Sequence, residues 1–365
     1  MNNNIVDKLF FELIQVSVEN RTCITKVPST DEWNELHQKA KKQAIVGMIF
    51  YAISKLPKNQ MPESKILLSW YAESEFIKRR NMLMNQRTAE ATKQFADSGM
   101  RSLILKGQAN ASYYPYPEYR MPGDIDILVE GKRKDIIKYV LQRDDVKHVQ
   151  FHHVDYALFD DVEVEVHFIP SLLNNYFANE KLQAFFKRYL NSCFGNNIEI
   201  GCNQRICMLT HKPNLVMQLV HIYGHYLFSG IGMRQFFDLY YLLKVAQFSK
   251  LDRIELCSFI KEIGIEKFVG AVMFVLMDVF GASEDLLICP VNQKEGKYLL
   301  DEIMIGGNFG MYDKRYINKK RSKFKSFCFV TYRNFRLFRR FPSDCIWYMV
   351  CRISQFLWRT MNRYK

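Results

Sequence analysis

Residues 162–168, Val-Glu-Val-Glu-Val-His-Phe, alternate strictly between apolar and polar side chains. A period of two is typical of a β-strand that has one buried and one polar face. The pattern predicts that Glu163, Glu165 and His167 share the polar face, while the three valines and Phe168 enter a core. This run therefore requires a sheet with one face free for polar chemistry.

A second predicted strand carries two aspartates. Residues 123–129 read Gly-Asp-Ile-Asp-Ile-Leu-Val, so Asp124 and Asp126 point to one face and lie about 6–7 Å apart along the strand. Two such carboxylates repel each other unless a cation lies between them. Magnesium binds carboxylate oxygens together with substrate phosphates, and two metal ions can hold both oxygens of an in-line displacement. If this strand neighbours residues 162–168, a glutamate there adds a third acid, as a metal ligand or a general base.

A third apolar run, Ser102–Lys106, ends in Lys106, and Gly107 follows it. A glycine lets the backbone approach a phosphate closely, and Lys106 can place a point charge on a triphosphate. Arg120, four residues before Asp124, is a second candidate for such a contact. Taken singly, each pattern has an ordinary explanation as a solvated strand edge or loop. Their order along the chain favours a functional site.

The order of elements indicates an α/β core between two helical regions. Residues 156–159 and 162–168 flank Asp160-Asp161 and predict a hairpin. A capped helix is expected from Ser29, and a long helix from about Glu63 to Asp97. We expect a helical region over 1–97, the core over 98–203, a helical region over 204–312 and a basic, aromatic helical tail over 313–365. Later helices are expected near 213–228, 234–247, 251–262 and 266–280.

The net charge of +13 belongs to the tail. Residues 314–365 hold 15 Lys+Arg and one acidic residue, Asp344, so they carry +14 and the preceding residues sum to −1. Arginines interleaved with Trp347, Trp358 and other aromatics suit RNA contact or an anionic membrane surface. A packed helical end with solvated arginines is the ordinary alternative.

The nine cysteines are odd in number and contain no C-x-x-C, which favours reduced thiols over disulfides or a zinc site. The N-terminus lacks a signal-peptide pattern, and the most apolar stretch, about 268–277, is too short to span a bilayer. We therefore expect a cytoplasmic protein without a transmembrane segment.

The motifs Leu105-Lys106-Gly107, Arg120-x-x-Gly123-Asp124-Ile125-Asp126 and Glu165-Val166-His167 resemble those of the nucleotidyltransferase superfamily related to DNA polymerase β. They are most similar to its uncharacterised bacterial branch, over about residues 85–245. This chain has Gly107-Gln108 where the superfamily usually has Gly-Gly or Gly-Ser.

The resemblance implies an α+β fold with a small mixed-sheet nucleotidyltransferase core. It also implies transfer of a nucleoside monophosphate from a nucleoside triphosphate, such as ATP, to an unknown acceptor, with release of pyrophosphate. Asp124, Asp126 and Glu165 would be the catalytic acids and would hold two Mg²⁺ ions, or Mn²⁺. Glu163 could replace Glu165 only in another strand register. The expected nucleotide contacts are Lys106, Gly107, Arg120, Gly123 and His167.

Two alternatives share these residues. One is a non-catalytic nucleotide- or RNA-binding regulatory protein on a transferase fold, and the other is a toxin-like enzyme that modifies tRNA or protein. The acceptor could be a small molecule, a protein or RNA. His221 and His225 have metal-ligand spacing on a helix, but without an evident third ligand we expect core histidines or histidines that support the ligands of a neighbouring site. Arg234 and Asp238, also four apart, can pair across a helix turn or face the nucleotide.

Overall fold

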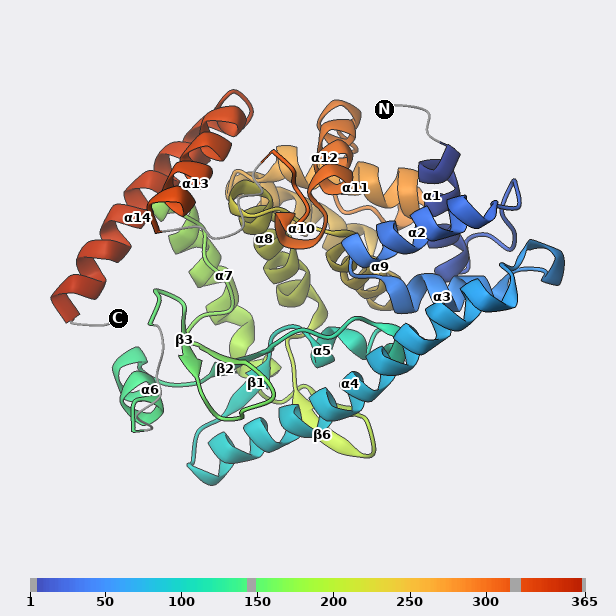
Figure 1. Ribbon diagram of the computed structural model, residues 1–365. Coiled ribbons are helices and arrows are strands. Elements are labelled where there is room, and N and C mark those ends of the chain that lie inside the picture. The colour runs from blue at the N-terminus through green and yellow to red at the C-terminus, as the bar shows by residue number, and fades with distance from the viewer. Residues whose placement is uncertain (1–4, 143–148, 316–322, 363–365) are drawn as a thin grey trace. The chain divides into compact units, whose positions relative to one another are not determined.

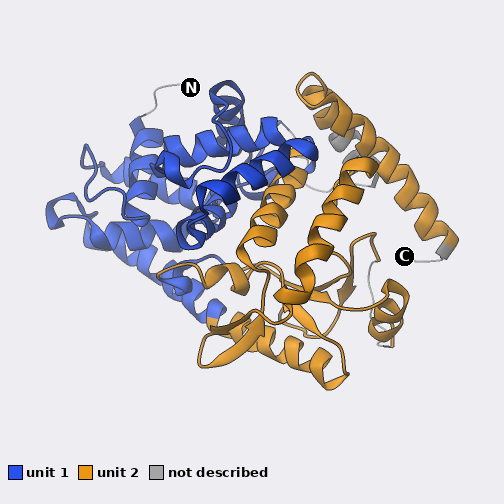
Figure 2. Cartoon of the chain, turned by 180° about the vertical axis from the view of Figure 1, so that it is seen from behind, with its two compact units in different colours: residues 1–81, 116–121, 228–325 blue, residues 82–115, 122–227, 326–365 orange. Residues whose placement is uncertain are grey.

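The computed structural model describes residues 5–142, 149–315 and 323–362. The chain divides into two compact units, each assembled from three separate segments, as Figure 2 shows. Unit 1 comprises residues 1–81, 116–121 and 228–325, and unit 2 comprises residues 82–115, 122–227 and 326–365. The predicted division into four consecutive regions concerns the order along the chain and stays a prediction.

Unit 1 is helical throughout its described secondary structure. Helix α2 begins at the predicted cap, where Ser29 and Glu32 form a reciprocal capping box. Helix α1 packs on α3 and α11 through an apolar face that includes the fully buried Leu9, Leu13 and Ile14. The helices expected at 234–247, 251–262 and 266–280 are confirmed. The helices of unit 1 are α1 (Ile5–Ser17), α2 (Thr30–Lys42), α3 (Val46–Lys55), α9 (Met233–Ala246), α10 (Lys250–Glu262), α11 (Glu266–Phe280) and α12 (Gln293–Gly306), with the first half of α4 (Ser64–Asp97).

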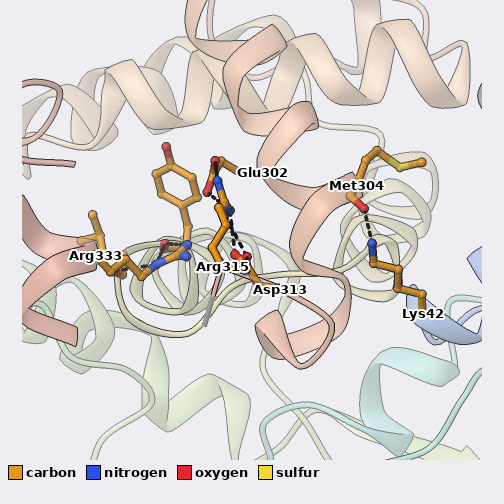
Figure 3. Close-up of polar contacts among 8 residues, drawn as sticks. Lys42, Glu302, Met304, Asp313, Arg315 and Arg333 are labelled. Atoms are coloured by element: carbon orange, nitrogen blue, oxygen red, sulfur yellow. Dashed lines mark hydrogen bonds and ion pairs between the residues drawn. The ribbon is translucent and has the colours of Figure 1, made fainter. Parts of the chain in front are cut away.

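Polar contacts hold the segment that follows α12 in unit 1 (Figure 3). Arg315 Nη1 lies 3.0 Å from Glu302 Oε1, and its Nη2 lies 2.6 Å from Asp313 Oδ2. Lys42 Nζ donates to the Met304 carbonyl over 2.7 Å. Arg315, near the start of the basic tail, is therefore paired with two acids of the unit.

Unit 2 contains the predicted mixed sheet (Figure 1). The strand order is β1-β2-β4-β3, with β2 and β4 parallel and the outer pairs antiparallel. This confirms the α+β fold and the hairpin of β3 and β4. The first hairpin strand lies earlier than predicted, because the ladder ends at Tyr156 and a turn follows in which Leu158 N donates to Tyr156 O. The strands are β1 (Ser102–Ile104), β2 (Ile125–Val129), β3 (His153–Tyr156) and β4 (Val164–His167).

One face of this sheet is apolar and packs on helices. Phe95 of α4 lies 5.6 Å, between ring centroids, from Tyr139 of α6 (Arg133–Val140) and 6.1 Å from Tyr156 of β3. The opposite face carries the alternating polar residues. Unit 2 also contains elements that the sequence patterns did not predict, chiefly α7 and a second hairpin. The elements that were not predicted are α5 (Gln108–Ala111), α7 (Tyr176–Cys193), β5 (Asn197–Ile200) and β6 (Gln204–Cys207). The remaining helices of the unit are α8 (His211–Phe228), α13 (Lys323–Phe338) and α14 (Pro342–Asn362).

The described cysteines are all free. Within the described ranges, no helix combines the length and the apolar character needed to cross a membrane.

Candidate active site

The structure brings three predicted acids together on the polar face of the sheet. Asp126 of β2 lies directly beside Glu165 of the parallel strand β4, and Asp124 immediately precedes β2. One carboxylate oxygen from each of the three lies within 4.8 Å of the others. Glu165 is half-buried in this cluster, whereas Glu163 is exposed. The adjacent strands thus create a dense concentration of negative charge.

Two basic side chains contact the deepest acid of the cluster. Lys106 Nζ lies 2.8 Å from Asp126 Oδ1, and His167 Nε2 lies 3.0 Å from the same oxygen. His167 Nε2 is also 3.4 Å from Glu165 Oε2. Asp126 is almost fully buried, with a side chain only 2% exposed, so these contacts replace the water that it loses. Lys106 and His167 therefore belong to the same site as the acids.

The pKa values of these groups follow from burial and from their neighbours. Burial acts to raise the pKa of Asp126, but Lys106 and His167 hold it far below its usual range. Burial likewise acts to lower the pKa of Lys106 and of His167, and the neighbouring carboxylates raise both above their usual values. The charge of Asp126 and then burial raise the pKa of Asp124. The cluster thus holds Asp126 ionised while Asp124 remains under electrostatic repulsion.

Glycine is required at the turn that follows β1. Gly107 has φ +58°, and a Cβ there would lie 3.3 Å from the carbonyl oxygen of Asp124. Leu105 N donates to Asp126 O over 2.9 Å, which keeps this turn next to β2. The predicted turn residues therefore lie at the edge of the acid cluster. Gly123 is exposed in the segment before Asp124.

Arg120 belongs to unit 1, where it is buried and forms a two-pronged ion pair. Its Nε and Nη2 donate to the two carboxylate oxygens of Asp238 on α9 over 2.7 and 2.8 Å. Asn81 Nδ2 donates to the Arg120 carbonyl over 2.8 Å, and Arg234 Nη1 lies 3.5 Å from the Met121 carbonyl. The pairing of residues 118 positions apart was not predicted, since sequence spacing suggested only Arg234 as a partner for Asp238.

Histidines supply a second feature that the sequence patterns missed. His153 of β3 lies opposite His167 of β4, and His152 lies beside both. The signal in the sequence was the His152-His153 pair, but its significance depends on a strand register that no local pattern shows. His221 and His225 of α8 pack edge to face with ring centroids 4.4 Å apart, and burial lowers the pKa of His221 well below its usual value. Both are partly exposed and join no candidate metal-binding group among the described residues, so the interpretation as core histidines stays a prediction.

Parts of the basic tail pack on unit 2. Arg333 of α13 is buried and donates from Nε to the carbonyls of Tyr226 and Leu227 at the end of α8, each over 3.2 Å. Arg133 lies over the ring of Trp358, 4.1 Å from its centroid. The packed interpretation of the tail therefore holds for these residues. Other apolar side chains of α14 are exposed, namely Ile346, Val350, Ile353, Phe356, Leu357 and Met361.

Comparisons with known proteins identify the family. A family model described as "Uncharacterised nucleotidyltransferase" matches residues 29–281. Among solved structures, the chain is similar to an antigenic nucleotidyltransferase-like protein from Paracoccidioides brasiliensis, with 14% identity and a TM-score of 0.34 over 60% of this chain and 95% of that chain. No curated protein matches the sequence significantly. The family match spans more than half of the 365 residues, so the chain belongs to this family of uncharacterised nucleotidyltransferases.

Proposed function

We propose that the protein is a metal-dependent nucleotidyltransferase that moves a nucleoside monophosphate from a nucleoside triphosphate to an acceptor. The observation that carries this proposal is the cluster of Asp124, Asp126 and Glu165, in which one carboxylate oxygen of each residue lies within 4.8 Å of the others. Membership in a nucleotidyltransferase family points to the same class of reaction.

The residues of the cluster fit a hard divalent cation. They offer carboxylate oxygens, the ligands that Mg²⁺ and Mn²⁺ prefer, and the raised pKa of Asp124 reports a repulsion that a cation would relieve. We expect Asp124, Asp126 and Glu165 to hold two such ions. Bound there, the metal would neutralise triphosphate charge and lower the pKa of the attacking hydroxyl.

In the proposed reaction, an oxygen of the acceptor forms a bond to the α-phosphorus while the bond from that phosphorus to the bridging oxygen breaks. Pyrophosphate leaves with the bonding electrons, and Glu165 accepts the proton of the acceptor hydroxyl. Lys106 supplies positive charge beside the acids, and the turn at Gly107 leaves room for phosphate oxygens. His167 positions Asp126 through its 3.0 Å contact.

Gly123 and Arg120 remain predicted nucleotide contacts. The exposure of Gly123 next to Asp124 leaves its backbone open to solvent and to a ligand. The guanidinium of Arg120 is engaged with Asp238, which supports a structural role for this side chain.

Two glutamates of one strand provide a matched test. We would incubate the protein with α-³²P-labelled nucleoside triphosphates, Mg²⁺, total RNA and lysate protein, and measure label transferred to each pool. Glu165→Gln should lower transfer by about 10²–10⁴-fold, the usual contribution of a general base. Glu163→Gln changes the same functional group two residues away at an exposed position and should leave transfer unchanged. Equal activity of the two variants, or full transfer by Asp126→Asn, would contradict the proposal.

The same experiment identifies the acceptor, because label enters RNA, protein or a small-molecule fraction. For RNA, we propose that the basic tail contributes to binding. The logarithm of the binding constant should then fall linearly with the logarithm of salt concentration, with a slope of roughly −0.7 per neutralised phosphate of a single strand. Salt-insensitive binding would exclude this role of the tail.

A further inference from the structure

The polar face of the sheet holds a second group of potential ligands beside the acid cluster. His153 and His167 are directly opposed in the antiparallel pairing of β3 and β4, with ring centroids 5.2 Å apart. Glu165 lies two residues before His167, so its side chain shares their face of the sheet. One ligand atom from each of these three residues lies within 4.8 Å of the others. The group shares Glu165 with the acid cluster but is otherwise made of imidazoles.

Both imidazoles approach the same carboxylate oxygen. His153 Nδ1 lies 3.5 Å and His167 Nε2 lies 3.4 Å from Glu165 Oε2. A tetrahedral ion with bonds of about 2.0–2.2 Å separates neighbouring ligand atoms by roughly 3.3–3.6 Å. The two measured separations therefore match the edges of such a coordination tetrahedron, and they are too long for good hydrogen bonds.

Buried nitrogen atoms in this group lack hydrogen bonds. His153 is only 5% exposed, and neither of its ring nitrogens has a hydrogen-bond partner among the described residues. The Oδ1 atom of Asp155 lies 3.6 Å from His153 Nε2, beyond hydrogen-bond distance. Native structures rarely leave buried polar atoms unsatisfied, and each case calls for an explanation such as an absent ion.

We propose that His153, Glu165 and His167 form a second metal site, which binds a divalent transition ion of the Zn²⁺ class. Imidazole nitrogens favour Zn²⁺, Co²⁺, Fe²⁺ and Ni²⁺ over Mg²⁺, which prefers oxygen. Two histidines and one carboxylate supply three ligands of a tetrahedral ion and leave the fourth position for water or for another ligand.

The shared residues link this site to the acid cluster. Glu165 would serve both sites, and His167 Nε2 would leave its 3.0 Å contact with Asp126 to bind the transition ion. Occupancy of the histidine site should therefore weaken Mg²⁺ binding at the acid cluster, and Zn²⁺ should inhibit. This consequence rests on the proposed function, whereas binding at the histidine site does not.

Cobalt is a suitable probe, because tetrahedral Co²⁺ absorbs visible light far more strongly than octahedral Co²⁺. We would titrate the full-length, chelator-treated protein with Co²⁺ and then displace it with Zn²⁺ in a calorimeter. The wild type should show an intense tetrahedral spectrum. His153→Asn should weaken Co²⁺ binding by more than about 100-fold, since even the loss of an outer partner of a ligand weakens binding by about 10–100-fold. His153→Gln provides a second variant if the asparagine variant does not fold.

Two controls separate the sites. His211→Asn, outside the group, should bind Co²⁺ within about twofold of the wild type. Asp124→Asn removes an acid from the other site alone and should keep the tetrahedral Co²⁺ spectrum. A wild type without a tetrahedral spectrum overturns the proposal, as does an unchanged His153→Asn variant or the loss of the tetrahedral spectrum in Asp124→Asn. Tetrahedral Co²⁺ that depends on His153, in a protein that transfers no nucleotide, would refute the proposed function and leave the metal site standing.

Discussion

The buried ion pair of Arg120 and Asp238 predicts a large loss of stability when one partner is removed. Both side chains are less than one-tenth exposed, and two hydrogen bonds of 2.7 and 2.8 Å join them. Asp238→Ala leaves a guanidinium buried without its main counter-charge, which destabilises a protein by about 3–5 kcal/mol. At about 2–4 °C per kcal/mol for a unit of this size, the melting temperature of unit 1 should fall by roughly 6–20 °C.

Tryptophan fluorescence follows the melting of unit 1 in a background where Trp347 and Trp358 of unit 2 are replaced by phenylalanine, because the buried Trp33 and Trp70 lie in unit 1. The matched control is the double variant Arg120→Met/Asp238→Leu, which replaces the pair by apolar groups. Such replacements are often neutral or stabilising, so the double variant should melt within a few degrees of the wild type. A loss below about 1 kcal/mol in Asp238→Ala would refute the reasoning, as would a double variant as unstable as the sum of its single variants.

Three further predictions concern unit 2. Gly107→Ala should lower the melting temperature by more than Gly99→Ala does. Both glycines have positive φ, but only at Gly107 would an added Cβ lie 3.3 Å from a backbone oxygen. Equal losses in the two variants would contradict the role of that contact. Millimolar Mg²⁺ should raise the melting temperature of the wild type and leave that of Asp124→Asn unchanged, and an equal shift in both would place the ion elsewhere. The pKa of His153, about 4 in the fold against about 6.5 unfolded, means that the unfolded chain binds the proton first. The free energy of unfolding is then lost as pH falls from 6.5 to 4, by about 2 kcal/mol at pH 5. Urea unfolding at pH 7 and at pH 5 measures this loss, which should be smaller in His153→Asn than in the wild type.

Local patterns in the sequence predicted much of the sheet and its chemistry. The alternation through Glu163, Glu165 and His167 reports a strand face directly, because side-chain direction in a strand depends only on position along it. The prediction that Glu165 joins the aspartates if the two strands are neighbours is confirmed, because Asp126 of β2 pairs with Glu165 of β4. The sequence also predicted helices that have a capping motif or a long apolar face, such as α2 and α11.

What escaped prediction depends on pairing between distant segments. The register that opposes His153 to His167 is set by the β3–β4 ladder, and the partner of Arg120 lies 118 residues away. Neither follows from a repeat of two or of 3.6 residues. Helix α7 begins at the capping residue Asn175, and Gly201 and Asn203 have positive φ between β5 and β6, so these local signals were present in the sequence and were missed. The interruption of each unit by segments of the other is likewise a property of the folded chain, not of any local composition.

This interleaving has a consequence for synthesis on the ribosome. Asn20, just after α1, donates to the carbonyl of Phe280 over 2.7 Å, and α1 packs on α11 as well as on α3. These partners are 260 residues apart, so at about 5–20 residues per second α11 is synthesised roughly 13–50 s after α1. During that interval the apolar face of α1 can use α3 but not α11. Unit 1 is thus completed only late in translation, and a ribosome that stalls before α11 leaves an unfinished core for chaperones to shelter.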